Sequence, residues 1–128
     1  MRGFVLLAHG ARNPQWGALF ETLAQDLGHA GQPARAAYLE YLQPDFGAAV
    51  DALVADGCRD IHVLPCFFAA SGHVMRDLPG LLEVAGRRHP GLRWRVLDAL
   101  GDQPAFRAAL LGVCQQLLAQ GRDEAPLR

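Results

Sequence analysis

Four apolar runs of strand length alternate along this chain with four stretches whose apolar residues recur at helical spacing. The apolar runs lie at about 3–8, 36–41, 61–67 and 94–97, and each is followed by one of the helical stretches. This alternation is typical of parallel strands joined by helical crossovers. We therefore predict an α/β fold in which helices flank both faces of a four-stranded parallel sheet.

Local signals place the ends of the predicted helices. Asn13 and Pro14 suit the start of the first helix, and Gly57 suits the end of the second. A connection over 68–76 separates the third strand from a helix that Asp77 would cap. The apolar stripes of the four helices are Trp16, Leu19, Phe20, Leu23 and Leu27; Phe46, Val50, Leu53 and Val54; Leu78, Leu81, Leu82 and Ala85; and Phe106, Leu110, Val113, Leu117 and Leu118.

Length and charge narrow the class of protein. With 128 residues, 51% of them hydrophobic, and no linker or low-complexity stretch, the chain is expected to form a single domain over 1–128. Its last residues, about 121–128, are polar and expected to fray. The formal net charge of −1 lacks the basic surplus of nucleic-acid binders and polybasic membrane anchors. No window approaches the roughly 20 apolar residues of a membrane span, so we expect neither nucleic acid nor membrane as a partner.

The number and spacing of the cysteines indicate the redox conditions of the cellular compartment. Cys58, Cys66 and Cys114 are odd in number and show no C-x-x-C spacing, which fits neither a disulfide framework nor a zinc ribbon. The apolar run near the N-terminus is too short for the hydrophobic region of a signal peptide. These observations favour the reducing cytoplasm.

Ionisable side chains follow the first three predicted strands. His9 precedes Gly10 after the first, Glu40 closes the second, and His73 follows the third. In an open parallel sheet the carboxyl ends of the strands meet at one edge, where ligands bind. Two imidazoles and a carboxylate suit borderline divalent ions such as Co²⁺, Ni²⁺ and Fe²⁺, and so few ligands leave coordination positions open. The pattern predicts a metal or acid–base site, with solvated loop residues as the alternative.

The same loops carry candidates for substrate binding. Arg12 and Arg76 flank them and could bind carboxylates with two hydrogen bonds each, or stay solvated. Ser71 and Gly72, just before His73, are assigned to substrate binding as well. The other histidines and the cysteine near the site are interpreted as structural: His62 on the sheet, His29 and His89 at helix ends, and Cys66 as a small buried residue.

Three ordered segments resemble a known family, the short sirohydrochlorin chelatases of the CbiX type, which are class II chelatases. The segments are Leu-Leu-Ala-His-Gly-Ala-Arg at 6–12, Tyr-Leu-Glu-Tyr-Leu-Gln-Pro at 38–44, and the stretch from Leu64-Pro-Cys-Phe-Phe through Ser71-Gly-His-Val to Asp77-Leu-Pro. The resemblance covers roughly residues 4–100. It departs from the family at Ala11, where serine is frequent, and at Asn13, where an acidic residue is frequent.

The resemblance implies the insertion of a divalent metal ion into sirohydrochlorin, on the route to cobalamin or siroheme. It implies that His9 and His73 bind the ion and that Glu40 assists proton removal or metal delivery. The metal, Co²⁺, Fe²⁺ or Ni²⁺, would be a substrate, and no organic cofactor is expected. Because longer class II chelatases enclose their tetrapyrrole between two such halves, we predict a homodimer.

Two other functions compete with this interpretation. A non-catalytic carrier of metal or tetrapyrrole would use the same residues. A phosphohydrolase or mutase with His9 as nucleophile is disfavoured, because that class places an arginine immediately before the histidine, and this chain has Ala8 there.

Overall fold

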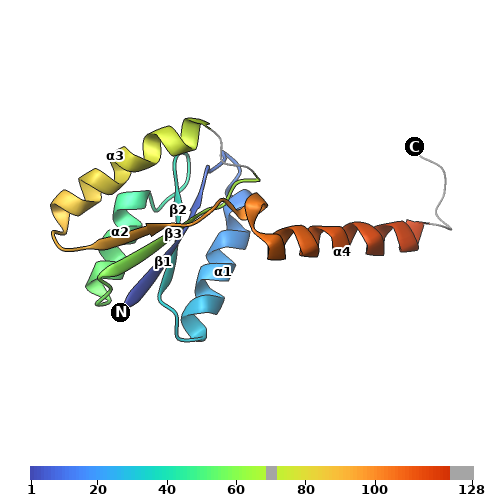
Figure 1. The fold of residues 1–128 in the computed structure, drawn as a ribbon, viewed down its shortest axis with the longest axis horizontal. Helices are drawn as coiled ribbons and strands as arrows, with labels where there is room; N and C mark the ends of the chain where they lie inside the picture. Colours follow the sequence, from blue (N-terminus) through green and yellow to red (C-terminus); the bar gives the residue numbers. More distant parts are fainter. Residues whose placement is uncertain (69–71, 122–128) are drawn as a thin grey trace.

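The computed structural model describes residues 1–68 and 72–121. Four strands, β1 (Arg2–Ala8), β2 (Ala34–Tyr38), β3 (Asp60–Pro65) and β4 (Arg93–Val96), form one parallel sheet in the order β2-β1-β3-β4 (Figure 1). The predicted four-stranded parallel α/β sheet is confirmed. Because β1 lies between β2 and β3, the loops that follow these three strands leave the sheet next to one another.

Helices cover the two faces of the sheet unequally. The short helix η1 (Pro14–Gly17) leads into α1 (Ala18–His29), which lies on one face, whereas α2 (Phe46–Ala55) and α3 (Gly72–Arg88) lie on the other (Figure 1). After β4 the chain forms the short helix η2 (Leu100–Asp102) and then α4 (Pro104–Gln120). In Figure 1, α4 projects away from the sheet instead of packing on it.

Side-chain alternation along β1 divides the core into two parts. Val5 and Leu7 point toward α2 and α3, where they are fully buried in a cluster with Phe46. Leu6 points to the opposite face and packs with Ala24 of α1. The larger part of the core therefore lies under the two-helix face.

The predicted helix ends are confirmed in part. Asn13 does cap a helix, since its Oδ1 accepts a backbone N–H at 3.0 Å, but this helix is η1, and α1 begins at Ala18. Asp45 caps α2 in the same way, at 2.8 Å. Gly57, with a φ of +98°, lies just beyond the end of α2, as expected of a glycine that ends a helix.

The prediction that Asp77 starts the third helix is wrong, because α3 begins at Gly72 and continues through Pro79. An aspartate shortly before a proline looks like a cap and a first turn. Here the burial of Leu78 and Ala85, each only 2% exposed, holds the segment as one helix despite the proline. Part of the predicted 68–76 loop is therefore helical.

The apolar stripes predicted for α1 and α4 are also wrong in part. Ala24 is the buried residue of α1, whereas Leu19 and Leu23 are exposed. The α4 stripe from Leu110 to Leu118 is exposed throughout. Within the described ranges, no helix combines the length and the apolar character that a membrane crossing requires.

Candidate functional site

The loops after β1 and β2 stay paired beyond the sheet. Regular pairing ends where Ala8 lies opposite Tyr38. Leu39 then donates its backbone N–H to the Ala8 carbonyl at 3.1 Å, and Glu40 donates to the His9 carbonyl at 3.0 Å. This extended ladder places His9 beside Glu40, although 30 residues separate them.

Gly10 permits the close approach of these two loops. Its φ of +96° lies in the left-handed region, and a Cβ at this position would collide with the carbonyl oxygen of Glu40. That oxygen is held in place, because it accepts the N–H of Leu42 at 2.9 Å. The glycine after His9 therefore has a steric role at the site.

The side chains of His9 and Glu40 are in direct contact, with 2.7 Å between Nε2 and Oε1. They are 57% and 47% exposed, so both are accessible to an incoming ion and a large substrate. Two neighbouring ligands bound at about 2.1 Å to one ion are roughly 3.0–3.4 Å apart, from octahedral to tetrahedral geometry. The pair could therefore hold one ion with little movement, or transfer a proton along its hydrogen bond.

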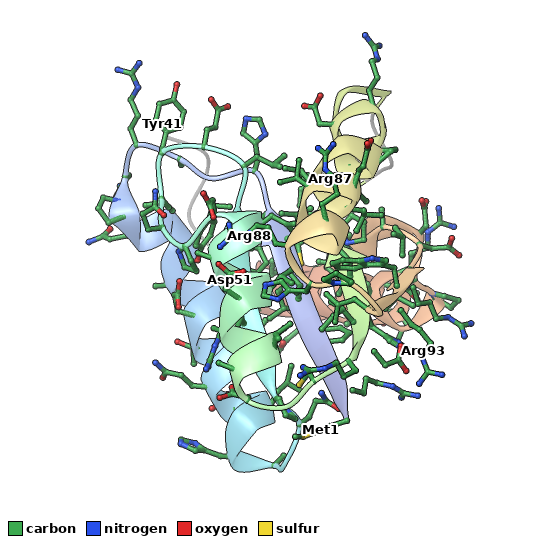
Figure 2. The ribbon with its side chains drawn as sticks, turned by 90° about the vertical axis from the view of Figure 1, so that its left-hand side faces the viewer. Met1, Tyr41, Asp51, Arg87, Arg88 and Arg93 are labelled. Carbon is green, nitrogen blue, oxygen red and sulfur yellow. The ribbon has the colours of Figure 1, made fainter. Side chains whose placement is uncertain are left out.

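Tyr41, the residue after Glu40, lies in an unusual conformation. Its φ of 68° is rare for a residue other than glycine, and its side chain is 59% exposed. The guanidinium carbon of Arg12 lies 5.2 Å from the centre of its ring, a cation–π geometry. Figure 2 shows Tyr41 at the end of the molecule opposite Met1. Arg12 was predicted from the sequence as a site residue, but Tyr41 was not. Nothing in the sequence around a loop tyrosine indicates that its backbone is left-handed.

The third predicted loop supplies the remaining candidates. The backbones of Gly72 and His73 form the start of α3, but the side chain of His73 lies outside the described residues, as does all of Ser71. Arg76 lies one turn further along α3 and is exposed. Contact of His73 with the His9–Glu40 pair stays a prediction.

Tyr38 supports the loop after β1 from inside the fold. Its hydroxyl lies 3.0 Å from both the Gly17 carbonyl and the Glu21 carboxylate. Burial, together with the hydrogen bond to Glu21, raises the pKa of the Tyr38 phenol. Burial also raises the pKa of the nearby Cys66 thiol to about 12, which keeps it protonated and unreactive. Cys66 therefore has the properties of a packing residue.

Two hollows in the described surface lie away from the His9–Glu40 pair. The larger one, of about 550 Å³, follows the outer edge of β2 and is lined by residues such as Gln25 and Arg35. A second, of about 450 Å³, lies at the amino ends of the strands near Arg93. Among the described side chains, which do not include that of His73, no three or more His, Cys, Asp or Glu cluster as a metal site. The exposure of both side chains makes the pair a surface site.

Comparison with known proteins decides the family. The family model CbiX matches residues 3–117, which include the loops after all four strands. The chain belongs to the CbiX family. A protein of Saccharolobus islandicus named sirohydrochlorin cobaltochelatase is 33% identical over 86 residues, 67% of each chain. A protein of Sulfolobus acidocaldarius with the same name is 30% identical over 123 residues, covering 91% of this chain and 100% of that relative.

Solved structures share the fold. A CbiX protein from Marinobacter aquaeolei VT8 matches with a TM-score of 0.81 and 28% identity, over 94% of this chain and 99% of that one. The sirohydrochlorin chelatase SirB from Bacillus subtilis subspecies spizizenii, solved in complex with cobalt, matches with a TM-score of 0.76 and 18% identity. That match covers 90% of this chain but 50% of SirB, so the fold of this chain corresponds to about half of the longer one.

Proposed function

We propose that this CbiX-family chain is a metal chelatase that inserts a divalent ion, Co²⁺ or else Fe²⁺ or Ni²⁺, into sirohydrochlorin on the route to cobalamin or siroheme. The observation that carries the proposal is the exposed His9–Glu40 pair, 2.7 Å apart, just beyond the ends of β1 and β2. The shared name of the curated relatives supports the substrate. The ion is itself a substrate, and the proposed reaction needs no organic cofactor.

Metal insertion makes three demands on a protein. Two pyrrole N–H protons must leave, the ring must distort so that its nitrogens face the ion, and the ion must shed water and protein ligands as the new bonds form. A loosely held ion satisfies the last demand, whereas a Cys₄ cage would retain it. Neutral imidazoles of His9 and His73 are proposed to hold the ion with open positions and then release it to the ring.

Glu40 is proposed to act mainly as the proton acceptor. A carboxylate beside the ring face can take each pyrrole proton in turn, so that the incoming 2+ charge is balanced by two departing protons. Its contact with His9 and its 47% exposure provide a route by which these protons reach solvent. The same geometry also suits a metal ligand, and substitution distinguishes the two roles.

Glu40→Gln keeps the shape of the side chain but removes the base. We expect turnover to fall at least about tenfold, with Co²⁺ and sirohydrochlorin affinities within a few-fold of wild type. Glu83→Gln, an exposed substitution of the same type on α3, is the matched control and should change neither quantity. A collapse of Co²⁺ affinity would make Glu40 a ligand, and unchanged turnover would place the acceptor elsewhere.

The metal-binding role of the histidines is tested by calorimetric titration of Co²⁺. The double variant His9→Ala and His73→Ala should bind Co²⁺ far more weakly than wild type, and binding by wild type should weaken in acid because the imidazoles must be neutral. His29→Ala, at the far end of α1, serves as the control. Unchanged affinity in the double variant would remove both residues from the site.

The large, acidic substrate needs partners beyond the pair. Arg12 and Arg76 are proposed to receive its carboxylates, together with Ser71 and Gly72. Tyr41 is proposed to contact the tetrapyrrole ring. Because the site is open in one chain, we propose a homodimer in which a second copy supplies the opposite wall. The reducing cytoplasm stays the proposed compartment, since Cys58, Cys66 and Cys114 form no disulfide.

The activity is tested by mixing purified protein with sirohydrochlorin and Co²⁺, Fe²⁺ or Ni²⁺ while the absorption spectrum of the ring is followed. The proposal predicts conversion of many equivalents of sirohydrochlorin per protein, faster than without protein. Conversion that stops at one equivalent would indicate a carrier. No acceleration with any of the three ions would overturn the proposal.

A further inference from the structure

Phe68 is the most exposed large apolar side chain among the described residues, at 80%. It lies three residues beyond Pro65, the last residue of β3, at the carboxyl edge of the sheet. Single exposed apolar side chains are common on protein surfaces. This one differs from most of them because its backbone is held in place, its ring is supported on one side, and it lies at the same edge as the His9–Glu40 pair.

Contacts with η2 hold the backbone of Phe68 in place. Gly101 of η2 donates its N–H to the Phe67 carbonyl at 2.9 Å. A Cβ at Gly101 would collide with the backbone of Phe68, so the two backbones are in direct contact. The Gly101 carbonyl in turn accepts the Nε–H of Arg107 at 3.1 Å. The segment that carries the exposed ring is therefore tied to η2 and to the first turn of α4.

The ring of Phe68 is supported on one side by a second aromatic ring. The centre of the Phe106 ring lies 6.0 Å from that of Phe68, and the two planes are tilted by 34°. Phe106 is half-buried, whereas Phe68 stays 80% exposed, so the remaining surface of the Phe68 ring faces solvent. A ring that is already oriented loses little conformational freedom when a ligand covers it. The geometry suits contact with a flat, apolar ligand surface.

Backbone pairing places Phe68 at the same edge of the sheet as the candidate site. Cys66, just beyond β3, donates its N–H to the Leu7 carbonyl of β1 at 2.7 Å. His9 follows Leu7 by two residues, and Phe68 follows Cys66 by two residues. The two segments therefore leave neighbouring strands at the same level, with His9 on the first and Phe68 on the second.

Exposed aromatic rings flank the His9–Glu40 pair on two sides. Tyr41, 59% exposed, follows β2, and Phe68 follows β3. Both strands are direct neighbours of β1, so they lie about 10 Å apart, which is two strand spacings. A macrocycle of four pyrroles is wide enough to extend over more than one strand end. Its apolar face could thus meet an aromatic side chain on each side of the pair.

We infer that Phe68 contacts the conjugated ring of the tetrapyrrole and, together with Tyr41, positions it over the His9–Glu40 pair. The inference rests on the proposed function, from which it takes the substrate, and it adds a substrate-binding residue on the β3 side. A phenyl ring has no atom that binds a metal ion or accepts a pyrrole proton. Phe68 therefore contributes to binding of the macrocycle and not to metal binding or proton transfer.

Fluorescence titration of the full chain with sirohydrochlorin is the first test. Phe68→Ala should weaken binding at least about fivefold, as expected for the loss of an aromatic ring that stacks on a flat conjugated ligand. Phe68→Tyr keeps the ring and should bind with nearly wild-type affinity. Phe68→Leu keeps apolar bulk without the ring and should lie between the two. Val84→Ala, a truncation of an exposed apolar residue on α3, is the control and should change nothing.

The insertion assay distinguishes ring contact from chemistry. Phe68→Ala should raise the KM for sirohydrochlorin by the same factor, with kcat and Co²⁺ affinity at wild-type values and a native circular dichroism spectrum. Equal sirohydrochlorin affinity in wild type and Phe68→Ala would overturn the inference. A lower mass of Phe68→Ala than of wild type in light scattering would also overturn it, because Phe68 would then be a contact between copies.

Photo-cross-linking tests the contact itself. With p-benzoylphenylalanine in place of Phe68, irradiation should attach sirohydrochlorin to the chain, and the absorption of the tetrapyrrole should then follow the protein in denaturing gels. The same replacement at Val84 is the control and should give no product. Absence of product at position 68, at a sirohydrochlorin concentration that saturates the protein, would contradict the inference.

Failure of this inference and failure of the proposed function give different results. A chain that binds sirohydrochlorin but inserts no metal would overturn the proposed function, and the titrations would still decide the role of Phe68. A wild type that inserts metal, with Phe68→Ala binding sirohydrochlorin equally well, would overturn this inference and leave metal insertion intact. A wild type that binds no sirohydrochlorin would overturn both.

Discussion

Substitution of Gly10 by alanine tests the packing that brings His9 to Glu40. The added Cβ would be strained in two ways: by the φ of +96° and by collision with the Glu40 carbonyl oxygen. Gly31 offers a matched control, because its φ is +92° but an added Cβ would meet nothing within 4 Å. The difference between the two variants therefore isolates the collision at the site.

The magnitudes follow from the contacts. A left-handed backbone at a residue with a Cβ costs about 1–2 kcal/mol, which is the whole loss expected for Gly31→Ala. In Gly10→Ala the loops must also move apart, which breaks the bond from Glu40 to the His9 carbonyl at 3.0 Å and loosens that from Leu42 at 2.9 Å. At about 0.5–1.5 kcal/mol each, these bonds bring the expected loss to about 2–5 kcal/mol.

Urea unfolding at equal protein concentrations, followed by tryptophan fluorescence, measures both losses. Calorimetric titration of Co²⁺ should in addition show weaker binding to Gly10→Ala than to Gly31→Ala, because only the first change displaces the loop that carries His9, a proposed ligand of the ion. Equal stability and equal Co²⁺ affinity in the two variants would refute the described packing of the loops.

Three further predictions concern residues around the site and the core. Burial raises the pKa values of the Tyr38 phenol and the Cys66 thiol, the latter to about 12. In alkaline solution the unfolded chain therefore loses protons from these two groups that the native state still holds. Stability should therefore fall as pH rises from about 9 toward 12, and Tyr38→Phe with Cys66→Ala should flatten this slope in urea unfolding. Tyr41→Gly should raise the unfolding free energy by up to about 1 kcal/mol by relieving the left-handed backbone, while weakening sirohydrochlorin binding several-fold in a fluorescence titration. Asp51 of α2 contacts Arg88, the last residue of α3, at 2.5 Å (Figure 2). It also contacts His89, just beyond α3, at 2.6 Å. Because these contacts are partly exposed, Asp51→Asn should lower stability by about 1 kcal/mol, and by less at high salt.

The sheet was predictable because its strands differ sharply from their connections. The buried run at β1 and the regular alternation of apolar runs with helical stretches leave few arrangements other than a parallel sheet. The start of α3 and the direction of α4 were not predictable in the same way. Burial of Leu78 and Ala85 overrides the local signal of Asp77 and Pro79, and the direction of α4 depends on contacts of Gly101 with a distant loop.

At the site, the placement of His9 and Glu40 followed from topology, since the ends of adjacent parallel strands must meet. Their 2.7 Å contact depends on the backbone ladder beyond the sheet and on the space that Gly10 leaves, which no spacing in the sequence encodes. The left-handed Tyr41 was missed for the same reason. The assignments of Ser71 and of the His73 side chain fall outside the described residues and stay predictions.

The most direct test of the central claim is the initial rate of Co²⁺ insertion into sirohydrochlorin, followed by absorbance, for wild type, His9→Ala and Glu40→Gln. His29→Ala and Glu83→Gln provide controls of the same residue types away from the site. We expect wild-type rates in both controls and at least about tenfold lower rates in both site variants. Site variants that insert Co²⁺ as fast as the controls would contradict the claim that the His9–Glu40 pair carries the reaction.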